Sequence, residues 1–346
     1  MKKIFILIAI LFAACNSEEK EQRKKAFSEV EVEVVFEDSI SIRAIDVIGH
    51  NVAFAGSNGM YGLYNAAQHK TKVNKIQHDS IYPEFRAVAS TSQDFFMLSV
   101  ANPALLYKTG DAGKMRLVYQ EEDEKVFYDS MMFWNDTEGI AMGDPLDNCL
   151  SIIITRNGGK TWKKVSCDNL PETMEGEAAF AASNSNIAIK GDKTWIISGG
   201  KTSRVFFSPD KGKTWDVFDT PIVQGEATTG AYSLDFYDEN TGIIFGGDYT
   251  KPEDNKANKA ITKDGGKTWQ LVSPGSGPGY KSSVRFVPNS KGEEIVAVGF
   301  TGIAYSSNRG KSWNDLSDEG FYTLRFLNDS TAYAAGKNRI ARLSFK

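Results

Sequence analysis

Histidine and cysteine are both scarce in this chain, with three of each among 346 residues. The histidines, His50, His69 and His78, lack the spacing of metal ligands, and chance accounts for their positions. An apolar run from Ile4 to Phe12 is too short to cross a membrane as a helix. The sequence therefore predicts no metal site, and no membrane-spanning helix at the N-terminus.

Motifs that carry enzyme chemistry are missing as well. No G-x-G-x-x-G leads from a strand into a helix, and no G-x-S-x-G is present. The glycine-rich stretch 275–282 has Tyr280 where a P-loop needs glycine before its lysine. Asp144, Asp147 and Asp248 lie in predicted loops and could bind calcium, but they lack an ordered ligand pattern. We therefore expect no cofactor, and we assign no catalytic residue.

Basic charge is also in deficit. The formal net charge is −4, and it becomes −6 without residues 1–14, which carry two lysines and no acids. No basic stripe interrupts this acidic balance. Nucleic acid is therefore excluded as an expected partner.

What the chain does contain is a phrase written four times at a period of roughly fifty residues, which indicates an array of similar units. The copies are residues 155–162 (TRNGGKTW), 208–215 (SPDKGKTW), 262–269 (TKDGGKTW) and 306–313 (SSNRGKSW). An Asp or Asn in a tight turn accepts hydrogen bonds from backbone N–H groups, and the glycine supplies a positive φ. Each phrase is predicted to be a β-hairpin turn whose tryptophan packs against its own blade.

A second repeat sets the number of units. Seven segments share an apolar alternation, a polar turn and an apolar run ending in a small residue: 42–56, 85–100, 127–143, 177–200, 231–247, 282–299 and 322–336. Seven such copies fit a seven-bladed, all-β propeller spanning residues 29–346. A decayed fifth phrase lies at 109–113. The last blade has only three strands, so we predict that Val30–Phe36 pairs with Arg339–Phe345 and closes the ring.

The N-terminus predicts export and anchoring. Lys2 and Lys3 precede the apolar run, which ends in Ala13-Ala14-Cys15. This resembles a bacterial lipobox, so residues 1–14 are expected to be a signal peptide and Cys15 a lipidated first residue. Plain cleavage beside an incidental cysteine is the alternative. Residues 15–28 are expected to be a disordered tether. We expect a lipid anchor in the bacterial cell envelope, at the outer membrane.

Polar residues gather where the predicted inner strands begin. Alignment of the seven copies places Arg43, Arg86, Asp129, Tyr232, Ser282 and Tyr322 at equivalent positions, with Glu177 close by. In a propeller these side chains would face the mouth of the central channel. They could bind a protein or a polar ligand there, or they could simply pair with one another across a wet channel.

The repeated phrase matches the Asp-box, or BNR, repeat. Four further segments carry the resemblance along with this repeat: Phe127-Tyr128-Asp129, Gly143-Asp144-Pro145, Gly176-Glu177 and Gly246-Gly247-Asp248-Tyr249. Together they resemble a bacterial Asp-box propeller family that is labelled photosystem II stability/assembly factor-like, and sometimes "oxidoreductase" or "glycosyl hydrolase". This resemblance implies a seven-bladed scaffold that holds a membrane protein during assembly. We add Tyr128, Asp248 and Tyr249 to the candidate partner-binding residues.

A sialidase-like glycoside hydrolase is the alternative function. That chemistry needs an arginine cluster, a tyrosine nucleophile and carboxylates. Arg43, Arg86, Arg285 and Arg325, with Tyr128, Glu177 or Asp129, imitate part of this set. The arginine-Ile-Pro signature of sialidases is missing, and seven blades exceed their six.

Cys149 and Cys167 flank the first repeated phrase. If Thr155 faces Thr161 in the hairpin, opposed residue numbers sum to 316, and the two cysteine numbers also sum to 316. Opposed Cβ atoms lie about 4.5–5.5 Å apart, which is near the span of a disulfide. The sequence predicts that the two cysteines lie close together, either bonded or as two buried thiols.

Overall fold

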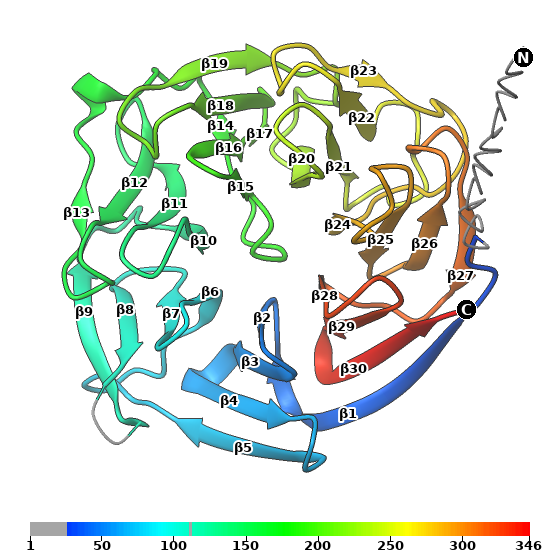
Figure 1. The fold of residues 1–346 in the computed structure, drawn as a ribbon. Coiled ribbons are helices and arrows are strands. Elements are labelled where there is room, and N and C mark those ends of the chain that lie inside the picture. The colour runs from blue at the N-terminus through cyan, green and yellow to red at the C-terminus, as the bar shows by residue number, and fades with distance from the viewer. Residues whose placement is uncertain (1–25, 111–112) are drawn as a thin grey trace, which may run out of the picture.

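Seven antiparallel sheets form a ring around a central axis in the computed structural model, which describes residues 26–110 and 113–346 (Figure 1). The protein is an all-β, seven-bladed propeller, as the sequence predicts. Six blades contain four strands each, and the sheet of blade 5 is extended by two short strands. No helix in the described part of the chain is long and apolar enough to cross a membrane.

Each blade runs from an inner strand at the axis to an outer strand at the rim. Blade 1 contains β2 (Ala44–Ile48), β3 (Asn51–Ala55), β4 (Met60–Asn65) and β5 (Lys70–Lys75). Blade 2 contains β6 (Phe85–Ser90), β7 (Phe95–Ser99), β8 (Ala104–Thr109) and β9 (Met115–Glu121). Blade 3 contains β10 (Tyr128–Phe133), β11 (Gly139–Pro145), β12 (Leu150–Thr155) and β13 (Lys163–Lys164). Blade 4 contains β15 (Ile187–Lys190), β16 (Lys193–Ile197), β18 (Arg204–Ser208) and β19 (Asp216–Asp219).

Blades 5 to 7 repeat this order. Blade 5 contains β20 (Thr229–Phe236), β21 (Gly242–Asp248), β22 (Lys259–Thr262) and β23 (Gln270–Leu271). Blade 6 contains β24 (Ser283–Phe286), β25 (Ile295–Gly299), β26 (Gly302–Ser306) and β27 (Asn314–Ser317). Blade 7 contains β28 (Thr323–Phe326), β29 (Thr331–Ala335), β30 (Lys337–Phe345) and β1 (Val30–Ser41). The two extra strands of the blade 5 sheet are β14 (Glu177–Ala178) and β17 (Gly199–Gly200).

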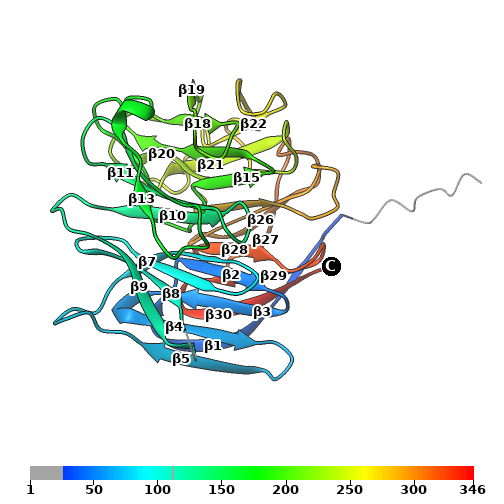
Figure 2. The same ribbon diagram turned by 60° about the vertical axis from the view of Figure 1, so that its left-hand side comes forward.

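The N-terminal strand closes the ring, and this prediction is confirmed. β1 pairs with β30, with Val30 opposite Phe345 and Ser41 opposite Lys337. Figures 1 and 2 both show β1 on the outside of blade 7, alongside β30. The predicted tether is too long at its C-terminal end, because Phe27 is buried against Tyr305 and Phe345. Cys15 and the predicted signal peptide lie outside the described residues.

The ring has two faces. We call the side where the inner strands begin the mouth face; Thr323 begins β28 there, opposite Ala335. We call the other side the turn face; Phe286 ends β24 there, and its neighbours Ile295 and Ser306 lead into the fourth repeated turn. All four repeated turns connect the third and fourth strands of their blades, so they all lie on the turn face.

The repeated turns have the hydrogen bonds that the sequence predicts. In the second turn the carboxylate of Asp210 accepts from the backbone N–H groups of Lys213 and Thr214, at 3.0 and 2.8 Å. The hydroxyl of Ser208 accepts from the N–H of Gly212 at 2.7 Å, and Gly212 has a φ of +80°. Side chains thus satisfy the backbone donors of a turn that continues neither strand.

Trp162 and Trp269 pack against their own blades as the sequence predicts, on Phe133 and Phe236. They also contact the preceding blade, which the sequence does not predict. Trp162 of blade 3 meets Phe96 of blade 2 edge to face, with ring centroids 6.4 Å apart. Trp269 of blade 5 likewise packs in a cluster with Trp195 of blade 4. The ring geometry carries each of these turns over the preceding blade, so the repeat fastens neighbouring blades together.

Cys149 and Cys167 form a disulfide, with Cα atoms 5.5 Å apart. The ladder between β12 and β13 pairs Ile153 with Lys164, one residue away from the register predicted from the turn. Cys167 lies beyond the end of β13, in the short 3-10 helix η3 (Cys167–Asn169). The bond therefore joins the start of β12 to the connection that leaves blade 3.

Candidate functional site

Two arginines lie at the mouth face with part of their hydrogen-bonding capacity unused. The guanidinium of Arg43 lies 4.2 Å from the centroid of the Tyr322 ring, and its Nη1 donates to the carbonyl of Ala182 at 3.5 Å. Nε of Arg86 lies 3.8 Å from Glu84, an ion pair without a hydrogen bond. Burial, and then the charge of Arg43, lowers the pKa of Arg86. The Nε atoms of both arginines are buried without a partner.

A pair of carboxyl groups lies beside these arginines. Asp129 of β10 is fully buried, and neither of its carboxyl oxygens has a hydrogen-bond partner. Burial raises its pKa well above the usual value, and the charge of Asp144 raises it further. Asp144, near the end of β11, is half-buried and accepts from the N–H of Ala179 at 2.6 Å. Burial raises the pKa of Asp144 to about 6.

An aromatic row adjoins the arginines and the carboxyl pair. The ring of Phe180 stacks on Tyr232 with centroids 3.8 Å apart, and Tyr232 meets Tyr280 edge to face at 4.8 Å. Tyr249 and Phe300 both contact Tyr280, at 6.5 and 5.4 Å. These last two side chains are 47% and 46% exposed, so the row ends in solvent-facing aromatic surface.

The channel behind the mouth is not open. Residues 179–186, which we call the plug, lead from β14 into β15, and in Figure 1 the loop before β15 reaches the centre of the ring. Asn184 donates to the carbonyl of Val88 at 2.7 Å and accepts from the N–H of Met131 at 2.9 Å. Ser183 donates to the carbonyl of Ser282 at 2.6 Å and its own carbonyl accepts from Thr323 at 2.9 Å. The plug thus hydrogen-bonds to inner strands all around the ring.

Two arginines, the buried Arg285 and the half-buried Arg325, hold the plug from the turn-face side. Arg325 donates to the carbonyl of Asn184 at 2.7 Å, and Arg285 donates to the hydroxyl of Ser185 at 3.0 Å. Burial, together with the charge of Arg285, lowers the pKa of Arg325 to about 9. The carboxylate of Asp235 lies 3.7 Å from Arg285. This cluster stabilises the plug.

Two of the predicted mouth residues, Tyr128 and Glu177, are buried and have structural partners, so they offer no free surface to a ligand. Tyr128 points between blades 2 and 3, where its hydroxyl donates to Glu121 at 2.7 Å. Glu177 is buried and accepts from Nε of Arg204 at 3.1 Å, so it closes the connection into blade 4.

The remaining predicted residues lie at the mouth in different roles. Ser282 is buried and donates to the carbonyl of Tyr322 at 2.7 Å. Tyr232 donates to the carbonyl of Thr228 at 2.8 Å. Asp248 accepts from the N–H of Thr250 at 2.9 Å and so fixes the loop that presents Tyr249. Arg43, Arg86, Asp129, Tyr249 and Tyr322 are the predicted residues with surface or hydrogen-bonding capacity to offer a ligand.

The glycosidase set does not assemble. Arg285 and Arg325 lie on the turn-face side of the plug, while Arg43 and Arg86 lie at the mouth. Within the described residues, no group of three or more His, Cys, Asp or Glu side chains is placed to hold a metal ion.

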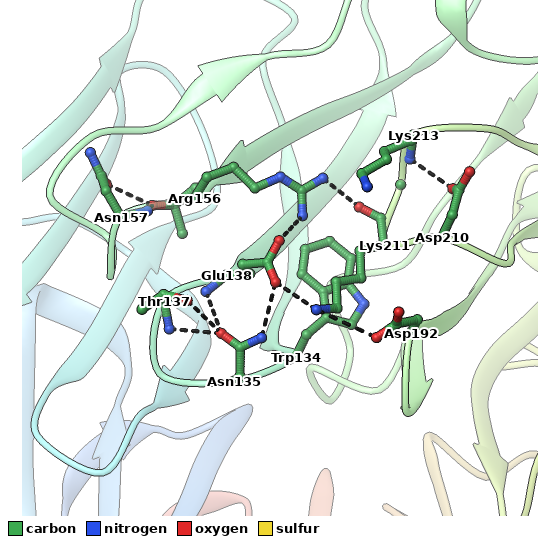
Figure 3. Close-up of polar contacts among 12 residues, drawn as sticks. Trp134, Asn135, Thr137, Glu138, Arg156, Asn157, Asp192, Asp210, Lys211 and Lys213 are labelled. Atoms are coloured by element: carbon green, nitrogen blue, oxygen red, sulfur yellow. Dashed lines mark hydrogen bonds and ion pairs between the residues drawn. The ribbon is translucent and has the colours of Figure 1, made fainter.

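One carboxylate on the turn face is paired with cations from two repeated turns (Figure 3). Glu138 accepts from Arg156 at 2.8 Å and from Lys211 at 2.6 Å, so one carboxylate joins the repeated turns of blades 3 and 4. The hydrogen bond from Lys211, followed by that from Asn135, lowers the pKa of Glu138 to about 2. A hollow at the rim, beside the decayed phrase, includes Asp94 and Lys108, which also form an ion pair. The mouth face is therefore the better candidate for a binding site.

Comparison with known proteins gives one partial family match. The family described as Sortilin-Vps10, sortilin, neurotensin receptor 3, matches residues 150–291, which run from β12 to beyond β24. No curated protein matches the chain in sequence.

Solved structures match nearly the whole chain at low sequence identity. "YCF48 bound to D1 peptide" is 12% identical, with a TM-score of 0.65, and the match covers 92% of this chain and 97% of that one. "Structure of U3-55K" is 12% identical with a TM-score of 0.60, covering 91% and 98%. "Crystal structure of RRP9 WD40 repeats" is 12% identical with a TM-score of 0.61, covering 93% and 99%. The chain is therefore similar in fold to these proteins, as a seven-bladed β-propeller.

Proposed function

We propose that this protein is a lipid-anchored scaffold of the bacterial cell envelope that captures a segment of a protein partner at its mouth face. The exposed aromatic pair Tyr249 and Phe300, on either side of Tyr280, is the observation that carries the proposal. Aromatic side chains dominate protein interfaces because each buries a large apolar area at little entropic cost. The likeness to a propeller solved with a bound peptide supports a peptide as the partner's contact.

Polar groups beside the aromatic row suit the same occupant. A peptide in extended form presents carbonyl acceptors and N–H donors along its length. The Nε atoms of Arg43 and Arg86 are donors without a hydrogen bond, and the carboxyl of Asp129 is an acceptor without one. Half of the eight unpartnered buried polar side-chain atoms in the described residues belong to these three side chains. The mouth therefore offers both apolar area and unused hydrogen-bonding groups.

The family and the anchor belong to the proposal as well. The repeated turns and the fold support placing the chain among Asp-box propellers of the photosystem II stability/assembly factor-like kind, with a different membrane protein as partner. The described chain begins beside Tyr305, at the edge of the turn face, and eleven residues lie between Cys15 and Phe27. Such a segment reaches at most about 40 Å when extended, which keeps the propeller close to the membrane.

Site-specific cross-linking in the native membrane tests the proposal. A photoreactive phenylalanine derivative replaces Tyr249 in one full-length variant and Leu63, an exposed side chain of β4 in blade 1, in the control. We expect a defined cross-linked protein from position 249 only, and at least a tenfold loss of it when Phe300→Ala and Arg43→Ala are added. Fractionation of Cys15→Ala, expected to leave the membrane, checks the anchor. Equal cross-linking from positions 249 and 63 would refute the binding site.

A further inference from the structure

The carboxyl pair of Asp129 and Asp144 lacks a counter-charge. No ion pair joins either residue to a lysine or arginine within the described chain. Arg86 is the cation whose charge acts on Asp129, yet its ion pair is with Glu84. Arg43 is engaged by the Tyr322 ring and the Ala182 carbonyl. Both arginines of the mouth thus have other contacts, and the pair is left without a cation of its own.

The cost of this arrangement is high for a structural feature. A buried carboxyl group without a hydrogen bond is unfavourable whether it is charged or neutral. Elsewhere the protein provides partners, as for Glu177, which is buried and bonded to Arg204. Asp129, equally buried in blade 3, has none. An orphaned group of this kind at a mouth indicates a partner that arrives from outside.

Geometry gives an incoming group a route to the pair. Asp144 is half-buried near the end of β11, so it can be reached from solvent, and Asp129 lies on the adjacent strand β10, close enough for the charge of Asp144 to act on it. The N–H of Ala179 holds one oxygen of Asp144, and the next residue, Phe180, begins the aromatic row. Two carboxyls next to aromatic rings favour a compact organic cation over an anion.

We propose that Asp129 and Asp144 form a receptor for a cationic side chain, the ammonium of a lysine or the guanidinium of an arginine, in the peptide bound at the mouth face. This inference rests on the proposed function and names the chemistry of its ligand. The cation lies between the two carboxylates, and the apolar part of its side chain packs against the aromatic row. Its charge removes the repulsion between the two carboxylates.

Matched peptides test the receptor. Three fluorescent peptides, acetylated and amidated, differ only at a central residue that is lysine, norleucine or glutamate, and fluorescence anisotropy measures their binding to the full-length protein in detergent. We expect the lysine peptide to bind at least tenfold more tightly than the norleucine peptide. Asp129→Asn and Asp144→Asn should each reduce this ratio to nearly one. Asp147→Asn, an exposed change in the loop after β11, should leave the ratio unchanged.

The thermal stability of the variants separates binding from folding. Asn has the shape of Asp without its charge, so Asp129→Asn should melt at the same temperature as the wild type or higher. If Asp129→Asn does not fold, the half-buried Asp144→Asn decides the result. Equal binding of the lysine and norleucine peptides, no binding at millimolar concentration, or preference for the glutamate peptide would overturn the receptor. None of these results depends on the cross-linking at Tyr249, so the two proposals can fail separately.

Discussion

Two adjacent glycines of the first repeated turn allow the contact between blades to be measured. Gly158 and Gly159 both have a φ of +70°, where a side chain is strained. A Cβ atom on Gly158 would lie 3.3 Å from the carbonyl oxygen of Asp136. A Cβ atom on Gly159 would overlap the ring of Phe96, which is fully buried in blade 2. The two positions share the backbone strain and differ in the contact with the neighbouring blade.

The expected magnitudes follow from these two terms. A non-glycine residue in the left-handed region costs about 1–2 kcal/mol, which Gly158→Ala should show alone. Overpacking a filled core costs typically about 1–3 kcal/mol more, so Gly159→Ala should lose about 2–5 kcal/mol in total. For a chain of this size each kcal/mol lowers the melting temperature by roughly 2 °C. We expect Gly159→Ala to melt about 2–6 °C below Gly158→Ala.

Thermal unfolding, followed by the near-ultraviolet circular dichroism of the aromatic side chains, is the assay. Phe96→Val in the Gly159→Ala background should recover part of the loss, with a coupling of at least about 1 kcal/mol in a double-mutant cycle. Equal melting temperatures for the two alanine variants would show that the turn does not press on blade 2. The account of the repeat as a fastener between blades would then be wrong.

Two further predictions concern stability. Reducing the Cys149–Cys167 bond, or replacing both cysteines with serine, should lower the free energy of unfolding by about 3 kcal/mol, because it opens a loop with a sequence separation of 18. Urea unfolding with and without reductant measures this loss, and identical midpoints would contradict it. Glu138 has a pKa lowered to about 2 in the folded protein, so its contribution is complete above the unfolded value near 4.5 and is lost as the pH falls toward 2. At pH 7 the Glu138→Gln variant should therefore be about 1–2 kcal/mol less stable than the wild type, a figure reduced because Glu138 is partly exposed. Near pH 2 the two proteins should be equally stable, and a difference in stability that persists at pH 2 would contradict the prediction.

Blade number and ring closure could be predicted because they depend on local patterns. Each blade repeats an alternation of apolar residues and a turn phrase, and the strand count of blade 7 required one more strand. β1 supplies it by pairing with β30, with Val30 opposite Phe345. The contacts of the tryptophans with the preceding blade could not be predicted in the same way. A period shows which residues are equivalent and does not show which blade each one touches.

The predicted set of mouth residues depends on the direction of each side chain. Tyr128 and Asp129 are adjacent on β10, and successive residues of a strand point to opposite sides. A bulge between Tyr128 and Ser130 shifts the register against β11 at this point. Alignment by position cannot see such a bulge, although one residue decides which side chain reaches the mouth. The proximity of Asp144 to Asp129 depends on the pairing of β10 with β11, so the sequence alone does not bring the two residues together.

The length of one repeated segment indicates in the sequence that the plug is an insertion. The copy from Glu177 to Gly200 has 24 residues, whereas the other six copies have 15 to 18. The extra residues are mostly alanine, serine and asparagine, which are small enough to fill a channel axis and polar enough to bond to the strands around it. Their identity as a plug could not be predicted, because their partners, such as Val88 and Thr323, lie far away in the chain.

The plug also decides how the mouth can bind. Asn184 and its neighbours hydrogen-bond to the inner strands, and Arg325 holds them from the far side. A partner therefore cannot thread through the ring; it must lie across the mouth face and send single side chains inward. Asp144 marks one place where a side chain can enter, with Asp129 on the adjacent strand. A shallow surface of fixed aromatic rings with one charged recess suits recognition of a short peptide segment better than the enclosure of a small molecule.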